Sequence, residues 1–143
     1  MPLVLKKEEN NVLIYIWKIE ESLEELVQLY PNVKFPKFKS EKRNLESICS
    51  RILLYLHSKN LKISYSENGS PLLNNHQSIS ISHSGNLVCI AISDSTIGVD
   101  IEEISEKTKK IQSKFINHNQ TNLTENKTSL IWCIKESVYK FHR

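Results

Sequence analysis

Hydrophobic positions follow two different spacings along this chain, which predicts a domain of the α+β class. Strand-length apolar runs rich in β-branched residues occur over 12–19, 61–65, 79–82, 87–92 and 97–102. The polar turn Asp94-Ser95 separates the last two runs and predicts that they pair as an antiparallel hairpin.

Helical spacing predicts four helices. Ser22-Leu23-Glu24-Glu25 is a capping-box pattern that begins a short helix, which Pro31 stops. A longer helix is expected from about Ser40 to Ser58, with Arg43 and Arg51 outside its apolar stripe. Further helices are expected over 105–116 and, after a polar loop at 117–127, at the end of the chain.

Composition narrows the class of protein. The 143 residues suffice for one compact domain, and a net charge of +3 is too mild to indicate a nucleic-acid or membrane partner. Three widely separated cysteines, with no signal peptide or membrane span, favour reduced thiols and a cytoplasmic location. Three glycines exclude a glycine-rich phosphate-binding loop, so any phosphate must be held by side chains, a metal ion or a helix terminus.

The run at 97–102 carries the first candidate chemistry. Its alternation predicts that Gly98, Asp100 and Glu102 share one side and that the apolar residues face the other. Residues two apart on a strand lie about 7 Å apart, so two carboxylates would repel each other unless a cation lies between them. This pattern is half of a metal site.

The last helix carries the second candidate. Trp132, Glu136 and Lys140 fall on one arc, opposite the expected core face of Leu130, Ile131, Ile134, Val138 and Phe141. An aromatic residue aligned with an acid and a base away from the core suggests a ligand surface. The alternative is a solvated Glu–Lys pair with an unrelated tryptophan, which would contribute only tenths of a kcal/mol.

Three motifs stand in order along the chain: Ile81-Ser82-His83-Ser84, then Gly98-Val99-Asp100-Ile101-Glu102, then Trp132-x-x-Lys135-Glu136-Ser137-x-x-Lys140. From about residue 40 to 140, this order resembles the 4′-phosphopantetheinyl transferases of the long type, which prime peptide, polyketide and fatty-acid synthases. The resemblance implies transfer of the phosphopantetheine arm of coenzyme A to a serine of an apo acyl or peptidyl carrier protein, with release of adenosine 3′,5′-bisphosphate.

The resemblance also implies a fold and a set of site residues. The family fold has two similar α+β halves, so residues 1–100 would form the first half and 101–143 the beginning of the second. Asp100, Glu102 and Glu136 match the magnesium ligands of the family, and Glu136 would also accept the serine proton. Such chemistry suits Mg²⁺, which prefers a few carboxylates together with substrate oxygens.

The coenzyme A contacts follow in the same way. His83 matches a family histidine at the 3′-phosphate, with Ser82 beside it, and Arg51 matches an arginine near the nucleotide phosphates. Lys140 can neutralise the pyrophosphate or the departing phosphate, and the family motif gives Lys135 a supporting phosphate contact. A polar turn residue is the alternative for His83, and an exposed helix arginine is the alternative for Arg51.

Two departures from the family lead to alternatives. Ser70 stands where the Gly-x-Pro turn of the family has lysine, and family members continue past the last helix with strands that complete the second half. We therefore also expect a truncated or degenerate, non-catalytic relic that binds coenzyme A, or a homo-oligomer formed through the uncovered second half. A metal-dependent nuclease is disfavoured, because Glu136 and Lys140 lie four apart on a helix rather than two apart on a strand.

Overall fold

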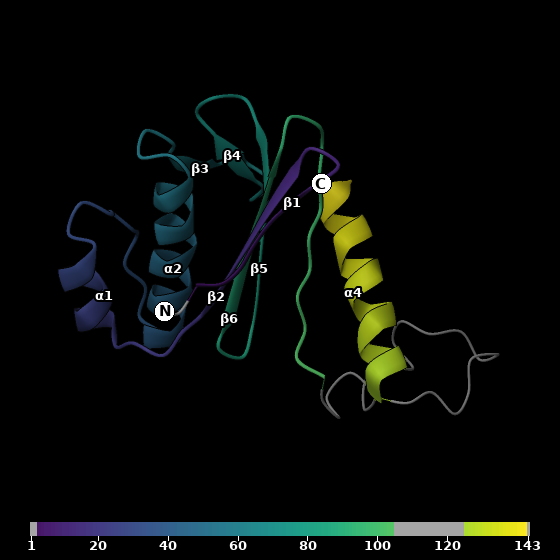
Figure 1. Ribbon diagram of the computed structural model, residues 1–143, viewed down its shortest axis with the longest axis horizontal. Helices are drawn as coiled ribbons and strands as arrows, with labels where there is room; N and C mark the ends of the chain where they lie inside the picture. The colour runs from purple at the N-terminus through teal and green to yellow at the C-terminus, as the bar shows by residue number, and fades with distance from the viewer. Residues whose placement is uncertain (1–2, 105–124, 143) are drawn as a thin grey trace.

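The computed structural model describes residues 3–104 and 125–142 as a sheet with helices on its two faces (Figure 1). Its elements in chain order are β1 (Leu3–Glu9), β2 (Val12–Lys18), α1 (Leu23–Leu29), α2 (Glu41–His57), β3 (Ile63–Tyr65), β4 (Pro71–Leu73), β5 (Ser78–Ser84), β6 (Leu87–Ser93) and α4 (Glu125–Phe141). The expected helix over 105–116 lies outside the described residues. No helix of the described part is long and apolar enough to cross a membrane.

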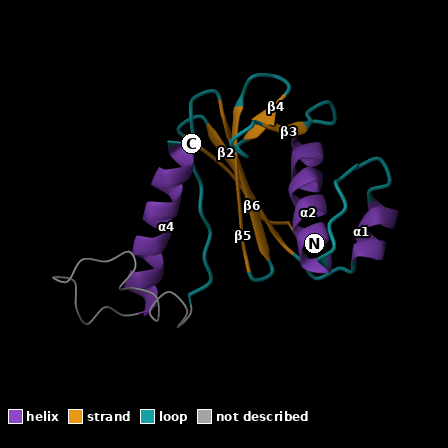
Figure 2. Cartoon of the chain, turned by 180° about the vertical axis from the view of Figure 1, so that it is seen from behind, coloured by secondary structure: helices purple, strands orange, loops and turns teal. Residues whose placement is uncertain are grey.

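The main sheet has the strand order β1-β2-β6-β5, with every neighbouring pair antiparallel. Seen from either side, α1 and α2 lie on one face of this sheet and α4 lies on the other (Figure 2). Strands β3 and β4 form a separate hairpin between α2 and β5. The α+β class is confirmed, while the division into halves at residue 100 stays a prediction.

The core lies between α2 and the sheet. Its fully buried side chains come from α1, α2 and β6, and include Leu26, Ile48, Ile52, Leu53, Val88 and Ile90. The helix ends follow the sequence signals: Ser22 forms the predicted capping box with Glu25, and Ser40 accepts a hydrogen bond from the Arg43 amide. These caps satisfy amide groups that a helix end leaves unpaired.

Strand β1 was missed by the sequence analysis. It joins β2 through the two-residue turn Asn10-Asn11, in which both residues have positive φ angles of 52° and 63°. A turn of two residues with positive φ is the type I′ hairpin connection, for which asparagine is well suited. The Asn-Asn pair was therefore the feature of the sequence from which this hairpin could have been predicted.

The predicted hairpin between 87–92 and 97–102 is wrong. Strand β6 pairs with β2 and β5, and the chain then runs back alongside β5 as an extended segment, residues 97–103, which we call the edge segment. Its amides bond to serine hydroxyls of β5, since Val99, Ile101 and Glu103 donate to the Oγ atoms of Ser80, Ser82 and Ser84 at 3.0–3.1 Å. The alternating serines of β5 thus hold a segment that makes no regular ladder with the strand.

Candidate functional site

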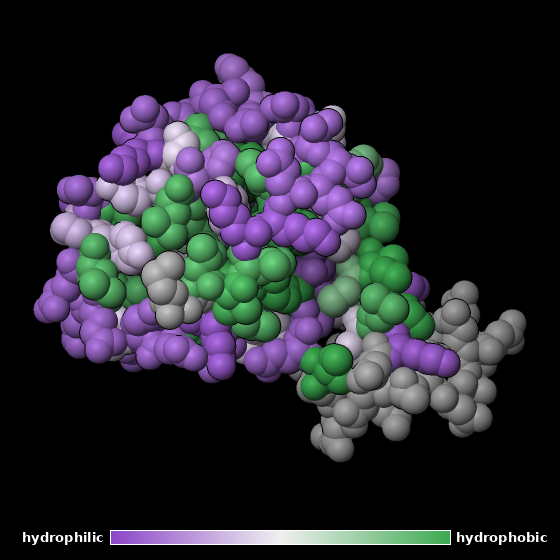
Figure 3. All heavy atoms as spheres, viewed as in Figure 1, coloured by the Kyte–Doolittle hydropathy of each residue, from purple (hydrophilic) through white to green (hydrophobic). Residues whose placement is uncertain are grey.

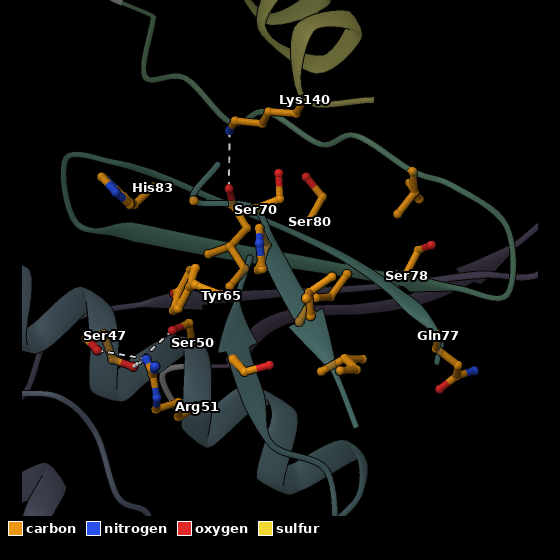
Figure 4. Close-up of a pocket in the computed structure, with 18 of the residues that line it drawn as sticks. Ser47, Ser50, Arg51, Tyr65, Ser70, Gln77, Ser78, Ser80, His83 and Lys140 are labelled. Carbon is orange, nitrogen blue, oxygen red and sulfur yellow. Dashed lines mark hydrogen bonds between the residues drawn. The ribbon is translucent and has the colours of Figure 1, made fainter. Parts of the chain in front are cut away.

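A pocket of about 780 Å³ opens between α2, the β3–β4 hairpin, β5 and the C-terminal end of α4 (Figure 4). Its described lining carries Arg43, Arg51, His83 and Lys140, with Glu46 as the one acidic side chain among these lining residues. In Figure 4, Lys140 reaches in from α4 while Arg51 lies across the pocket on α2. The volume is typical of a small-molecule site, and the excess of positive charge suits an anion.

The two arginines are held in place by groups of the same region. Arg51 Nη1 donates to the carbonyl and hydroxyl oxygens of Ser47, one turn earlier, at 3.2 and 2.8 Å. The Arg43 guanidinium lies 4.1 Å from the ring centre of Phe38, a cation–π contact. The Phe38 backbone is tied to α2 in turn by the Asn44 side chain. Both arginines are thus oriented before any ligand binds.

The β3–β4 hairpin forms another wall of the pocket. Gly69 has a φ of +82°, which favours glycine at this turn, and the Ser70 amide donates to Ser66 Oγ at 3.1 Å. Ser70 Oγ is buried and has no hydrogen-bond partner among the described residues. The serine at the position where the resemblance implies a lysine therefore brings an unpaired hydroxyl to the pocket wall.

The predicted neighbours Ser82 and His83 point to opposite sides of β5, as adjacent strand residues do. His83 lines the pocket, and its Nδ1 lies 3.3 Å from Glu46 Oε1. Ser82 is buried on the other side and donates to Asp100 Oδ1 at 3.0 Å. Lys135 is exposed on α4 and, like Ser82, does not line the pocket. The structure brings Arg51, His83 and Lys140 together there, and the roles of all five residues remain predictions.

The sequence analysis missed Glu46. It is 8% exposed and lies on the buried side of α2, two residues before Ile48 and next to the apolar stripe of the predicted helix. Its signal was a carboxylate within an otherwise apolar helical face, since buried acids are rare unless they are paired.

The packing of α4 reverses the prediction for its two faces. Trp132 Nε1 donates to Glu102 Oε1 at 2.8 Å, and Lys140 Nζ donates to Asp100 Oδ1 at 3.3 Å, so this side of α4 packs on the edge segment. Glu136 lies one turn from each on the same row, and therefore faces the same segment. We call the contact of this side of α4 with Asp100 and Glu102 of the edge segment, together with Glu136, the acidic seam.

The predicted core face of α4 is the exposed one. Among its residues Leu130, Ile134, Val138 and Phe141 are 60%, 54%, 52% and 44% exposed. Apolar side chains gather over α4 in Figure 3. A helical stripe shows which residues share a face, but the side that packs on the protein depends on what lies opposite.

Gly98 lets α4 approach the edge segment. A Cβ atom at this position would lie 2.1 Å from the Ser137 carbonyl oxygen and 2.7 Å from the Phe141 amide nitrogen. Both atoms belong to the helix backbone and cannot move aside alone. Gly98, Asp100 and Glu102 therefore share one side of the segment, as the alternation predicted, and that side faces α4.

Lys140 uses its whole ammonium group within the protein. Nζ donates to the Ile81 and Val99 carbonyl oxygens at 3.2 and 3.1 Å, in addition to Asp100. An ammonium has three N–H donors, so all three have partners in this arrangement. A direct contact with a phosphate would require Lys140 to give up one of these bonds.

The acidic seam fits a cation only in part. The Asp100 side chain is 6% exposed, and its Oδ2 is buried without a hydrogen-bond partner among the described residues. An unpaired buried carboxylate oxygen is stabilised by a cation when one binds. Both Glu102 oxygens are engaged, by Trp132 and Ser84, and no three acidic, histidine or cysteine side chains of the described part are grouped to hold a metal. The shared magnesium ion of Asp100, Glu102 and Glu136 stays a prediction.

Cys133 lies at the same seam as an unreactive group. Burial first, and then the nearby carboxylates of Asp100 and Glu102, raise the pKa of its thiol to about 12. The thiolate is the nucleophilic form of cysteine, so this side chain stays protonated and inert near neutral pH. A nucleophilic role for Cys133 is therefore disfavoured.

The described part of the chain is an α+β domain in which a basic pocket, chemically suited to an anion, lies beside a seam of carboxylates. No protein-family model matches the chain. It is 32% identical over 96 residues to the 4′-phosphopantetheinyl transferase gsp of Aneurinibacillus migulanus, a match that covers 62% of this chain and 40% of that relative. This similarity to a phosphopantetheinyl transferase confirms the resemblance seen in the motifs, and the match spans 40% of that protein.

Proposed function

We propose that this chain binds coenzyme A in the basic pocket and transfers its phosphopantetheine arm to a serine of an apo carrier protein. The observation that carries this proposal is the convergence of Arg43, Arg51, His83 and Lys140 from three elements on one pocket. Positive side chains at this density can offset the charge of a pyrophosphate and a further phosphate. The acidic seam adjoins the pocket through Lys140, which contacts both.

In the proposed reaction, the basic pocket and the acidic seam have different tasks. Serine Oγ attacks the phosphorus that bears the pantetheine arm, and the bond to the departing adenosine 3′,5′-bisphosphate breaks. Glu136 takes the serine proton as general base, and the basic side chains stabilise charge on the phosphate oxygens. A magnesium ion held by Asp100 with Glu102 and Glu136 would supply further positive charge at those oxygens.

Mass spectrometry of an apo carrier protein tests transfer directly. The carrier is incubated with this chain, coenzyme A and Mg²⁺, and the expected result is a mass increase of one phosphopantetheinyl group. Glu136→Gln should abolish the increase while coenzyme A still binds, and Glu8→Gln, an exposed acid on β1, serves as the matched control. A carrier protein that stays unmodified with the unaltered chain would overturn the proposal of transfer.

Binding of coenzyme A without transfer is the second candidate. The observations that favour it are the fully used ammonium of Lys140 and the Asp100 oxygen occupied by Ser82 and Lys140. Isothermal titration with coenzyme A, with and without Mg²⁺, separates the two functions. Binding that leaves the carrier unmodified supports this second candidate, and absence of binding rejects both.

A further inference from the structure

We propose that Glu46 is a positioning residue for His83, and that the pair turns the histidine into a fixed anion-binding group of the pocket. This proposal deepens the coenzyme A site and rests on the proposed function. The observation behind it is a carboxylate that is 8% exposed, within 3.3 Å of the Nδ1 atom of a half-exposed imidazole.

Glu46 needs a positively charged neighbour. Its Oε1 is buried and accepts no hydrogen bond of regular geometry from the described residues, and a buried unpaired carboxylate costs several kcal/mol. Two groups lie within ion-pair distance, His83 at 3.3 Å and Lys42 at 3.8 Å. Lys42 is 67% exposed and can contribute little, whereas His83 Nδ1 is the closer donor.

The pair also fixes the direction of the ring. His83 Nδ1 faces Glu46, so Nε2, on the far side of the imidazole, is left without a partner among the described residues. A protonated imidazole donates from both nitrogens. With Nδ1–H committed to Glu46, Nε2 is the ring atom presented to a ligand, and a protonated ring would donate Nε2–H to a bound anion.

Glu46 is otherwise out of place in an anion site. It is the one acid among the described lining residues of a pocket whose other charges are basic, and a bare carboxylate there would repel a phosphate. The direction in which anion affinity changes when Glu46 is neutralised therefore tests the proposal. If Glu46 acts through His83, its neutralisation weakens anion binding, and if it acts only as a nearby negative charge, its neutralisation strengthens binding.

The experiment compares Glu46→Gln with Glu41→Gln, an exposed acid in the first turn of the same helix. Glutamine keeps the shape of the buried side chain, so we expect the fold to be retained. A ¹H–¹⁵N spectrum of the backbone amides checks this. We expect Glu46→Gln to weaken coenzyme A by about tenfold in titration calorimetry, equivalent to about 1.4 kcal/mol, and Glu41→Gln to leave it unchanged. Unchanged or tighter binding in Glu46→Gln would overturn the proposal.

Two further measurements separate this pair from the proposed function. The ring ¹⁵N resonances of His83 in the ligand-free protein report which nitrogen carries a proton, and they should change in Glu46→Gln but not in Glu41→Gln. In a His83→Ala background, Glu46→Gln should no longer weaken binding.

The ligand can also be varied, using inorganic pyrophosphate as a second probe. If the His83 ring resonances change with pyrophosphate but not with coenzyme A, the Glu46–His83 pair is kept and the coenzyme A function is rejected. Absence of a shift with either anion would reject both, and ring resonances that are identical in the two forms would reject the pair alone.

Discussion

Lys140 and Asp100 form a buried ion pair that links α4 to the edge segment: Nζ lies 3.3 Å from Oδ1, with the side chains only 18% and 6% exposed. The same ammonium bonds to carbonyl groups of β5 and of the edge segment. One lysine near the end of the helix therefore joins three parts of the chain, and its removal leaves a buried carboxylate with one donor fewer.

Lys140→Met should destabilise the fold by about 3 kcal/mol, because removing one partner of a buried ion pair strands the other charge. Urea unfolding followed by circular dichroism measures the loss. The control is Lys37→Met, an exposed lysine of the connector before α2, which should change stability by less than about 0.5 kcal/mol. Equal stability of both variants would show that Lys140 does not hold α4 in solution.

Gly98→Ala should loosen α4 from the edge segment, since its Cβ would meet the helix backbone at 2.1 Å. The expected cost is about 1–3 kcal/mol, typical of overpacking. The indole N–H resonance of Trp132, assigned with Trp132→Phe, should move as its bond to Glu102 is lost. Ser95→Ala, at an exposed position just upstream, should leave the resonance in place; a stationary resonance in Gly98→Ala as well would contradict the close approach.

Ser82→Ala should cost about 1–3 kcal/mol, because it leaves the Ile101 amide without its acceptor and removes a donor from Asp100. Ser84→Ala acts on the more exposed amide of Glu103 and should cost less than about 1 kcal/mol. Hydrogen exchange at the Ile101 and Glu103 amides measures both effects. The serine contacts would be refuted if Ile101 exchanged equally fast in the unaltered protein and in Ser82→Ala.

Stability should fall in alkaline solution, because burial raises the pKa of Cys49 to about 12 and that of Cys89 to about 11. An unfolded thiol loses its proton near its ordinary pKa while the folded thiol keeps it, so stability is complete below about pH 9 and declines as pH rises toward the folded values. Each thiol contributes at most about 1.4 kcal/mol per pH unit.

Unfolding in urea at pH 8, 9 and 10 measures this decline. Cys49→Ala should lower stability at pH 8 by leaving a cavity, yet its stability should fall less steeply with pH than that of the unaltered chain. Parallel pH profiles for the two proteins would show that the Cys49 thiol does not contribute to the slope.

The spacing of apolar residues was sufficient to predict the helices and strands for which local signals and tertiary packing agree. Strand β2 and helices α1 and α2 appear near their predicted bounds, with Ser22 and Ser40 as caps. Strand β1 was missed because its lysines and glutamates dilute the apolar pattern, as befits a strand at the edge of a sheet.

The candidate site was likewise predictable from the sequence only in part. The resemblance selected Arg51, His83 and Lys140, which share the pocket, but it could not show that Lys140 also bonds to Ile81 and Val99. Those are bonds to backbone atoms, which leave no trace in side-chain identity. The orientation of α4 was equally hidden, because it depends on a long-range contact with Gly98.

The arrangement at the two margins of the sheet has a consequence for association. On β5, Lys140 occupies the Ile81 carbonyl and the edge segment runs beside the strand, while the opposite outer strand β1 carries Lys6, Lys7, Glu8 and Glu9. Exposed strand margins are where foreign chains add on and seed aggregation, and charge or occupied carbonyls discourage such addition. The lysine that secures α4 thereby also helps prevent the sheet from being extended by another molecule.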